Sequence, residues 1–427
     1  AGELSPRLDG RNDLAKYSAG CATVENMVIY PHGAAARRPG TQFVASVKTP
    51  AAKTRLIPFE FSTEQTYILE FGNQYIRFYR NNGQIESSGS AYEISTPYLT
   101  AELFDIKFAQ SADVMYITHP NHQTRKLSRT GHTSWSLAAV EFTNGPFLDS
   151  NITTTTLTPA SAGVGTGVNV TASAVTGING GSGFLTTDVG RQIRIGDGYG
   201  IITARTNTTV VVVTVTTAFA NANANSDWSL GSFSTTTGFP SCVSFFEQRL
   251  VFAASINNPQ TVYFSKSGDY ENMDANIGGT VADDDAIIYT IASNQVNAIR
   301  FLTSARTLII GTAGGEFVVS GGGDNNAVTP TNIMIKKQSN HGAANVDAIS
   351  VGNATLFLQR AKRKIRELAY NFDVDGYIAP DLTILAEHIT EGNVVEMAYQ
   401  EEPLAIIWCV RGDGQLIALT YQREQEV

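Results

Sequence analysis

The sequence has few of the residues that form disulfides, and no long apolar run. Its 427 residues include only three cysteines, Cys21, Cys242 and Cys409, whose spacing matches neither a disulfide framework nor a thiolate metal site. We expect all three to be buried as small apolar side chains. No apolar run approaches the roughly 20 residues that a membrane-spanning helix needs. The segment Ala1–Pro6 has no signal-peptide pattern. The sequence therefore predicts a chain without disulfides and without a membrane span.

Positive charge is also scarce. Only 16% of the residues are charged, and the formal net charge is −9. A protein that binds nucleic acid generally needs a basic surface to neutralise phosphates, so general nucleic-acid binding is disfavoured. An acidic wall would still let a DNA duplex slide past without adhering. Net charge alone does not separate these two cases.

Recognised catalytic motifs are missing. The sequence has no Gly-x-Ser-x-Gly elbow, no phosphate-binding Gly-Lys-Ser and no His-Glu-x-x-His, and none of its six histidines stands in such a frame. The nearest approach to a metal pair is His119-Pro120-Asn121-His122, but its position between two apolar runs favours a hairpin turn over a pair of ligands. We therefore expect no enzymatic activity, no cofactor and no metal.

Two further segments were candidates for ligand binding. A Ca²⁺ loop would need alternating oxygen ligands and a downstream Glu, which Asp283-Asp284-Asp285 lacks. We expect this run to cap backbone amides at the start of the strand that follows. The glycine-rich segment 311–323 lies between predicted strands with no helix after it, so it does not meet the structural condition for phosphate binding.

The residues that are abundant indicate a β protein. The chain has 38 glycines, 16 tyrosines and 21 phenylalanines, a composition typical of many short strands joined by tight turns. A pattern of two alternating strands around a polar turn begins at Phe59 and recurs about fifty residues later, with Ser111 in the place of Ser62 and Tyr116 in the place of Tyr67. Further copies begin near Val243, Ala298, Ala348 and Val395.

Each copy predicts three to four short antiparallel strands. One such sheet cannot bury both of its faces, so neighbouring sheets must stack, and radial stacking produces a propeller. We therefore predict an all-β fold, a propeller-like array of about six blades.

An insertion interrupts the repeat between its second and third copies. Residues 149–235 are rich in Gly, Ser, Ala and Thr, with few charges. Turn patterns such as Gly196-Asp197-Gly198 favour a small folded β-barrel or sandwich domain over the alternative, a disordered linker. The predicted strands are 168–172, 192–195, 200–205, 210–215 and 228–230. The predicted organisation is an N-terminal extended segment with a first strand (1–48), blades (49–148), the insert (149–235) and further blades (236–427).

The last predicted sheet lacks a closing strand. The strand Thr41–Ala45 could complete it, or the natural protein could continue beyond Val427. We favour continuation, because an open sheet edge invites pairing with other chains.

Two basic clusters are the candidate contact residues. Arg37 and Arg38 precede Thr41–Ala45, and a second cluster occupies a predicted hairpin; its members are Arg360, Lys362, Arg363, Lys364 and Arg366. One interpretation is a contact with phosphates or with an acidic protein surface. The other is a solvated turn. The turn-rich N-terminal segment Gly2–Gly40 is the predicted interface, since it has no core periodicity of its own.

A series of motifs resembles a known family. The segments are Gly2–Pro6, Leu14–Tyr17, Cys21–Asn26 and Pro31–Gly40 at the N-terminus, then Phe245–Phe252, Ser265–Tyr270, Asp283–Ile287 and Gly314–Val318. In this order they resemble tail tubular protein B, the tail nozzle of short-tailed bacteriophages (podoviruses). The resemblance covers residues 1–148 and 236–427. The insert and the early C-terminus depart from the family pattern.

The resemblance implies a virion structural protein located in the tail. Subunits would form a homo-oligomeric ring, a hexamer, below an adaptor protein, with a channel for the transient passage of double-stranded DNA during genome ejection. The outer platform would attach tail fibres or other tail proteins. The alternative function is a glycan-binding or carbohydrate-active propeller at a phage or cell surface, since propellers often carry ligand sites, although the sequence offers no clear pair of catalytic carboxylates.

Overall fold

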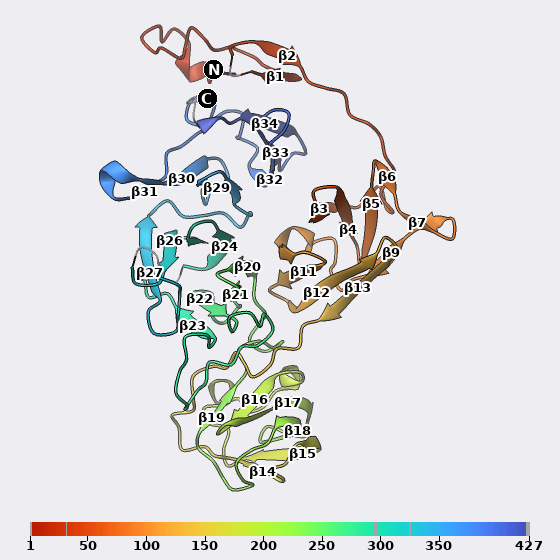
Figure 1. Ribbon diagram of the computed structural model, residues 1–427, viewed down its shortest axis with the longest axis vertical. Coiled ribbons are helices and arrows are strands. Elements are labelled where there is room, and N and C mark those ends of the chain that lie inside the picture. Colours follow the sequence, from red (N-terminus) through yellow and green to blue (C-terminus); the bar gives the residue numbers. More distant parts are fainter. Residues whose placement is uncertain (1, 31, 294–296, 324–325, 424–427) are drawn as a thin grey trace. The chain divides into compact units, whose positions relative to one another are not determined.

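The structure is a computed structural model that describes residues 2–30, 32–293, 297–323 and 326–423. Pro31 of the N-terminal motif series and the residues after Arg423 lie outside this part. The described chain is all-β, and its helices are 3-10 turns of three residues each (Figure 1). Their bounds are η1 (Pro6–Leu8), η2 (Leu103–Asp105), η3 (Asn179–Gly181), η4 (Thr186–Asp188) and η5 (Phe372–Val374). In the described residues no helix is long and apolar enough to cross a membrane.

The chain divides into two compact units. Unit 1 comprises residues 1–44, 297–319 and 335–427, and unit 2 comprises residues 45–296 and 320–334. This division differs from the four predicted segments, whose boundaries remain a prediction. Each of the six repeat copies forms an antiparallel sheet of its own, and three of these sheets lie in each unit.

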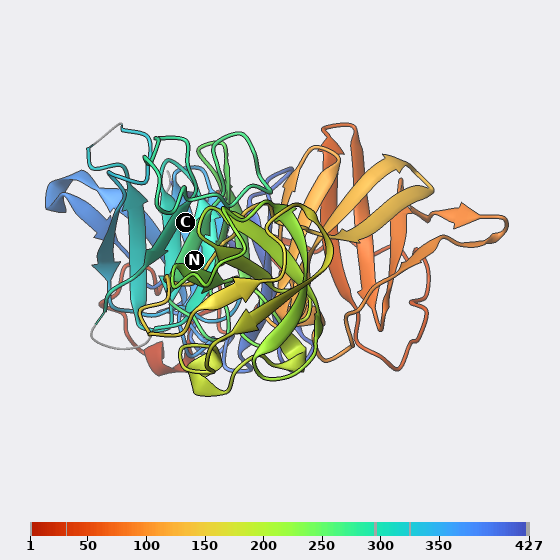
Figure 2. The same cartoon turned by 90° about the horizontal axis from the view of Figure 1, so that it is seen from below.

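The first two sheets of unit 2 are consecutive meanders, as the repeat predicts. The first has the order β3-β4-β5-β6, with β9 also pairing with β5, and the second has the order β10-β11-β12-β13. Figure 2 shows the β7–β8 hairpin projecting from the first sheet. The bounds are β3 (Arg55–Ser62), β4 (Gln65–Gly72), β5 (Tyr75–Arg80), β6 (Gly83–Gln84), β7 (Glu86–Ser87), β8 (Ser90–Ala91), β9 (Glu93–Ser95), β10 (Lys107–Ser111), β11 (Val114–His119), β12 (His122–Gly131) and β13 (Ser134–Ala139).

These two sheets share one apolar core. Strand β3 alternates buried and exposed residues because its side chains point to opposite faces of the sheet. Its inward Phe59 meets the ring of Trp135 from β13 at 4.8 Å between centroids, and Trp135 also contacts Tyr67 and Phe78. One sheet thus covers the face that its neighbour cannot bury alone.

The third sheet of unit 2 follows the insert and packs on the second. Its order is β20-β21-β22-β23, and the shared core includes Tyr116 of β11 and Leu250 of β21. The bounds are β20 (Cys242–Phe246), β21 (Arg249–Ala253), β22 (Thr261–Phe264) and β23 (Ile287–Thr290).

The insert forms a six-stranded sheet with its own core. The strand order is β14-β15-β18-β17-β16-β19, and the core contains only residues from Leu157 to Leu230. A bridge between Leu157 and Asn225 joins the first strand to the segment before the last, so the sheet curls toward a barrel. The bounds are β14 (Leu157–Pro159), β15 (Gly165–Ala172), β16 (Gln192–Ile195), β17 (Gly198–Arg205), β18 (Val210–Thr217) and β19 (Trp228–Leu230). All five predicted strands are present, and β14 was not predicted.

The insert leaves and rejoins the chain at neighbouring points. Phe147 bridges Gly231, the Leu148 amide donates to Leu230 O, and the Ser232 amide donates to Pro146 O. The entering and leaving segments therefore pair like two antiparallel strands.

Unit 1 holds the last three repeat sheets. Their orders are β24-β25-β26-β27, β28-β29-β30-β31 and β32-β33-β34. Phe301 and Phe357 belong to one core that joins the first two, and Leu358 and Ile407 to one that joins the last two. The bounds are β24 (Ile299–Ser304), β25 (Leu308–Thr312), β26 (Gly315–Ser320), β27 (Met334–Ser339), β28 (Ile349–Val351), β29 (Ala354–Leu358), β30 (Ile365–Asn371), β31 (Gly376–Ile378), β32 (Val394–Gln400), β33 (Ile406–Arg411) and β34 (Leu416–Thr420).

Two expectations are wrong. Residues 41–45 are in no strand, so they do not complete the last sheet. The N-terminal segment instead forms a ribbon of β1 (Met27–Ile29) and β2 (Ala35–Arg37), and Thr420 of β34 donates to Ile29 O. Cys21 is exposed, whereas Cys242 and Cys409 are buried as expected. Cys21 lies in an isolated bridge with Glu3, outside the named strands, and its residue type alone does not reveal this exposure.

Candidate functional site

The beginning of the predicted N-terminal interface, residues 3–7, contacts residues 385–388 of the same unit. The Ser5 amide donates to Leu385 O at 2.7 Å, and His388 Nε2 lies 2.7 Å from Glu3 Oε1. Arg7 pairs with Glu387. The rest of the fold thus orders the beginning of this segment, which has no core periodicity of its own.

Arg37 and Arg38 lie at the end of the β1–β2 ribbon. Arg37 is exposed in β2, and the Arg38 guanidinium donates to the backbone oxygen of Pro39 at 3.2 Å. Neither forms an ion pair with another described residue. Both remain candidates for an external contact.

The second basic cluster occupies the β29–β30 hairpin, as predicted, but the structure divides its members. Arg366 lies inside strand β30, where its guanidinium donates to Gln359 Oε1 at 2.9 Å and to Ala379 O at 2.5 Å. Lys364 Nζ is 2.9 Å from Asp381 Oδ2. Arg363 lies 3.6 Å from Glu391. These three cations therefore act within the fold.

Arg360 and Lys362 are the cations of this hairpin that remain available. Both lie in the turn between β29 and β30, and neither forms an ion pair within the described chain. The φ of Lys362 is 59°, in the left-handed region that a tight turn can require of its residues. Within this hairpin, Arg360 and Lys362 are therefore the remaining candidates for an external contact.

The Asp283–Asp285 run supports the buried side chain of Arg249. The Arg249 guanidinium donates to the backbone oxygens of Asp283 and Asp285. Asp285 Oδ2 accepts from the Ala282 amide at 2.8 Å, just before β23, which is the capping role that the sequence predicted. Lys266 pairs with the other carboxylate oxygen of Asp285 at 2.7 Å.

The His119–His122 motif forms the hairpin turn that the sequence predicts. Pro120 and Asn121 connect β11 to β12, and the two histidines are paired across the strands. Their rings lie 4.9 Å apart between centroids. Facing side chains of a cross-strand pair share one side of the sheet, so both imidazoles point the same way.

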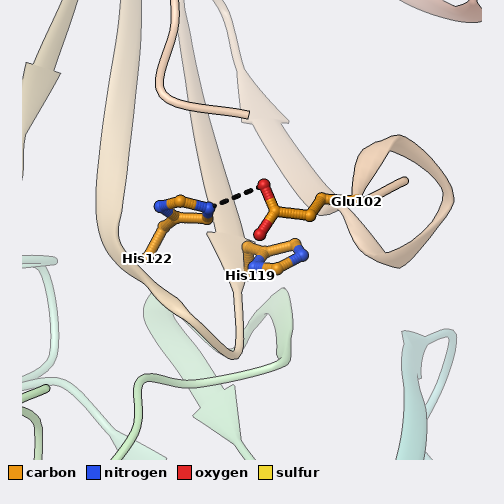
Figure 3. A group of neighbouring side chains, drawn as sticks. All are labelled: Glu102, His119 and His122. Atoms are coloured by element: carbon orange, nitrogen blue, oxygen red, sulfur yellow. Dashed lines mark hydrogen bonds and ion pairs between the residues drawn. The ribbon is translucent and has the colours of Figure 1, made fainter. Parts of the chain in front are cut away.

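A carboxylate from another segment completes this cluster. Glu102 precedes the turn η2, and its Oε2 lies 2.9 Å from His122 Nε2 (Figure 3). One ligand atom from each of Glu102, His119 and His122 lies within 4.8 Å of the others. The same Oε2 accepts the Leu99 amide at 2.9 Å, which fixes the orientation of the carboxylate. We refer to these three residues as the His₂Glu cluster.

Burial and neighbouring groups shift the pKa values of two members of the cluster. His119 is 1% exposed, and burial together with the nearby His122 lowers its pKa below the ordinary value. For Glu102, burial acts to raise the pKa, but the Leu99 amide and His122 outweigh it and the pKa is lowered. The arrangement favours a neutral imidazole at His119 and an ionised carboxylate at Glu102, which are the forms that bind metal ions.

A tyrosine closes one side of the cluster. Tyr98 is fully buried, and its ring meets His122 edge-on at 5.3 Å and lies 6.0 Å from His119. Burial raises the pKa of its phenol, so the hydroxyl stays protonated at neutral pH. Its oxygen has no hydrogen-bond partner within the described chain.

A polar groove lies between the insert and residues 236–257. Its volume is about 430 Å³, and its lining includes Asp149, Asn151, Asn179 and Asn257. Trp228 also lines it but is only 3% exposed, and its indole N–H donates to Thr155 O. The groove therefore offers amide, hydroxyl and carboxylate groups with little aromatic surface.

Sequence reasoning missed Glu102. It stands seventeen residues before His119 in a different segment, and the two are brought together only by the packing of η2 against the second sheet. A carboxylate at such a separation carries no spacing that marks it as a ligand.

Comparison with known proteins gives weak likenesses to solved structures. No family model matches the chain, and no curated protein matches it in sequence. The Neurospora crassa Pan2 WD40 domain is 9% identical, with 74% of each chain covered and a TM-score of 0.32. The β-propeller domain of Cps50 (Swd1) from Myceliophteria thermophila is 7% identical, covering 83% of this chain and 80% of that one, with a TM-score of 0.37. Apo AztD from Citrobacter koseri is 8% identical, covering 83% and 77%, with a TM-score of 0.35.

Proposed function

We propose that this chain is a structural subunit of a bacteriophage tail, of the nozzle type that its motif series resembles. In this proposal, copies of the chain form a homo-oligomeric ring, a hexamer, that meets an adaptor protein and supports tail fibres. Double-stranded DNA passes through the ring during ejection. The protein acts through its shape and its surfaces, without bond chemistry.

The observation that carries the proposal is a set of apolar side chains on projecting segments. Phe372 is 87% exposed and Val374 is 63% exposed, both in η5 at the tip of the β30–β31 hairpin. Phe43 is 77% exposed in the segment that follows the β1–β2 ribbon. Contiguous exposed apolar patches mark sites that other proteins cover, and Phe372 and Val374 stand two residues apart at one hairpin tip.

The acidic net charge supports the passage of DNA. With a formal charge of −9, the chain has no general basic surface that would hold a duplex by its phosphates. Among the predicted contact residues, Arg37, Arg360 and Lys362 form no ion pair with another described residue, and we assign them to contacts with acidic protein surfaces.

Assembly of the purified full-length protein tests the proposal. Native mass spectrometry and cryo-EM, with and without an adaptor protein, should show a closed ring. The double variant Phe372→Ser with Val374→Ser should weaken ring formation at least about tenfold, because interface energy concentrates in a few apolar anchors. The control is Ile152→Ser, which removes a side chain that is 98% exposed on the insert. A chain that stays monomeric and ignores the adaptor would refute the proposal.

The glycan-binding alternative has one observation in its favour, the polar groove between the insert and residues 236–257. Amide and carboxylate groups such as those of Asn151, Asn179 and Asp149 are suited to sugar hydroxyls. Glycan-array binding by the full chain, lost in Asp149→Ala, would favour this alternative over the tail proposal. Hydrolysis of a host polysaccharide would favour a carbohydrate-active enzyme.

A further inference from the structure

Two buried polar atoms at the His₂Glu cluster have no partner among the described residues. They are His119 Nε2 and the hydroxyl oxygen of Tyr98, on side chains that are 1% and 0% exposed. A buried polar group that is left unpaired destabilises the fold. Two such atoms on rings that contact each other indicate a place built for a further group.

We propose that Glu102, His119 and His122 bind a first-row divalent cation, with Zn²⁺ as the best match. Two imidazole nitrogens and one carboxylate oxygen are a ligand set that Zn²⁺ prefers, and a fourth position is left for water or another group. Mg²⁺ and Ca²⁺ prefer sites made of oxygen ligands alone. The inference does not depend on the proposed tail function.

The hydrogen bonding of His122 and Glu102 suits such an ion. The His122 Nε2–H donates to Glu102 Oε2 at 2.9 Å. A cation in the place of that proton would be held by both atoms, with the imidazole proton moved to Nδ1. The Leu99 amide would continue to orient the carboxylate, as partners of metal ligands commonly do.

His119 must exchange one weak hydrogen bond for the metal bond. Its Nδ1 accepts the Asn121 amide at 3.2 Å, a long contact. If Nε2 binds the ion, Nδ1 carries the proton and this contact is lost. Asn121 is exposed, so its amide can donate to water instead.

Binding requires modest changes in these separations. Atoms bound to tetrahedral Zn²⁺ lie about 3.4 Å apart, given bonds of about 2.1 Å. The three ligand atoms lie within 4.8 Å of one another, and the pair His122 Nε2 and Glu102 Oε2, now 2.9 Å apart, would have to separate slightly. Two ligands flank a two-residue hairpin turn and the third lies in the loop before η2, where rotation of the side chains would supply these changes. Asp105 lies near His119 and Arg125 lies near Tyr98. Because their opposite charges offset each other, Glu102 supplies the negative charge of the site.

Titration of the chelator-treated full-length chain tests the proposal. We expect isothermal calorimetry with ZnCl₂ to give one site per chain, a rise in the melting temperature, and no response to MgCl₂. Co²⁺ used as a substitute should give visible absorption bands of a low-coordinate site. Glu102→Gln and His122→Gln should each weaken Zn²⁺ binding at least about 100-fold, since even the loss of an outer partner costs 10- to 100-fold.

Matched variants separate a loss of metal binding from a loss of folding. In His122→Gln the new amide can still donate to Glu102, so the fold should persist without the metal. The control is His32→Gln, an exposed histidine outside the cluster, which should bind Zn²⁺ like the wild type. The inference is overturned if binding is not stoichiometric, or if His122→Gln binds as tightly as the control.

Discussion

Single buried side chains couple neighbouring sheets in this molecule. Trp135 is 7% exposed and touches three rings from the first sheet, at centroid distances between 4.5 and 5.2 Å. Its indole N–H donates to His132 O at 3.1 Å, so the polar end is satisfied as well. The ring therefore fills the space between two sheets and leaves no polar group unpaired.

Trp135→Ala should lower the free energy of unfolding of unit 2 by about 3–5 kcal/mol, because the remaining aromatic rings cannot close the space it leaves. Urea denaturation followed by far-UV circular dichroism measures this change. Phe43→Ala serves as the control, since that side chain is largely exposed, and it should change stability by less than about 0.5 kcal/mol. A change in Trp135→Ala as small as in the control would mean that the sheets do not share this core.

Glu316 in β26 is a buried carboxyl whose titration should influence stability. It is fully buried, and burial raises its pKa above the ordinary 4.5, only partly offset by the Ser339 hydroxyl that donates to it. The folded state therefore prefers the protonated form. This contribution to stability is complete below about pH 4.5 and is lost as the pH rises through the folded pKa.

Glu316→Gln removes the titration, so the stability of the variant relative to the wild type should increase as the pH is raised from 5 to 8. Urea denaturation at several pH values, or hydrogen exchange in β26, measures the difference. Glu401→Gln alters an exposed carboxyl of the same unit and should follow the wild-type pH profile. Parallel profiles for Glu316→Gln and wild type would contradict the assignment.

At the scale of elements, the insert is held by a buried ionic network. Asp188 in η4 is fully buried; it pairs with Arg191 at 2.9 Å and accepts from Asn179 and Thr236. Burial lowers the pKa of Arg191, and Asp188 opposes that shift. A buried cation that loses its only anionic partner destabilises a fold strongly.

Asp188→Ala should therefore destabilise the insert by about 3–5 kcal/mol and leave the repeat sheets of unit 1 unaffected. Hydrogen exchange resolved by segment compares β15–β18 with β28–β30. Asp197→Ala changes an exposed carboxylate of the same domain and should have little effect. Equal loss of protection in both regions would show that the insert does not unfold independently.

Repeated elements were predictable from the sequence, whereas the cluster of ligands was not. Strands such as 192–195 and 228–230 follow from alternating apolar residues and turn residues, which act locally. Strand β14 ends in Pro159, and a proline argues against a strand from sequence alone, although it is tolerated here because β14 is an edge strand. Thr41–Ala45 has a strand-like sequence but finds no partner strand, since pairing depends on tertiary placement. Glu102 and the internal partners of Lys364 and Arg366 depend on tertiary packing in the same way.

At the scale of the whole molecule, consecutive sheets within each unit share apolar cores, and the insert interrupts this succession without disturbing it. The chain departs after Phe147 and returns at Gly231, two residues bridged to each other. Paired antiparallel residues lie about 5 Å apart. A short linker can span that distance.

Replacement of residues 149–229 by a short Gly-Ser linker should therefore leave the sheets β10–β13 and β20–β23 folded. The β signal in circular dichroism, corrected for the missing residues, and segment-resolved hydrogen exchange would report this. The separate fragment 145–238 should unfold cooperatively, because its core lies entirely within it. An aggregated or unfolded truncated chain would show that the insert supports its host.

The bridged entry and exit of the insert also bear on how this chain can change over generations. Because the two ends of the insert lie side by side, the host sheets do not constrain the length of the segment inserted between those ends. Mutations within it can accumulate, and the domain can be lost or exchanged, while selection on the surrounding sheets continues separately. We expect the lineage of this protein to show its greatest variation in length between Leu148 and Leu230.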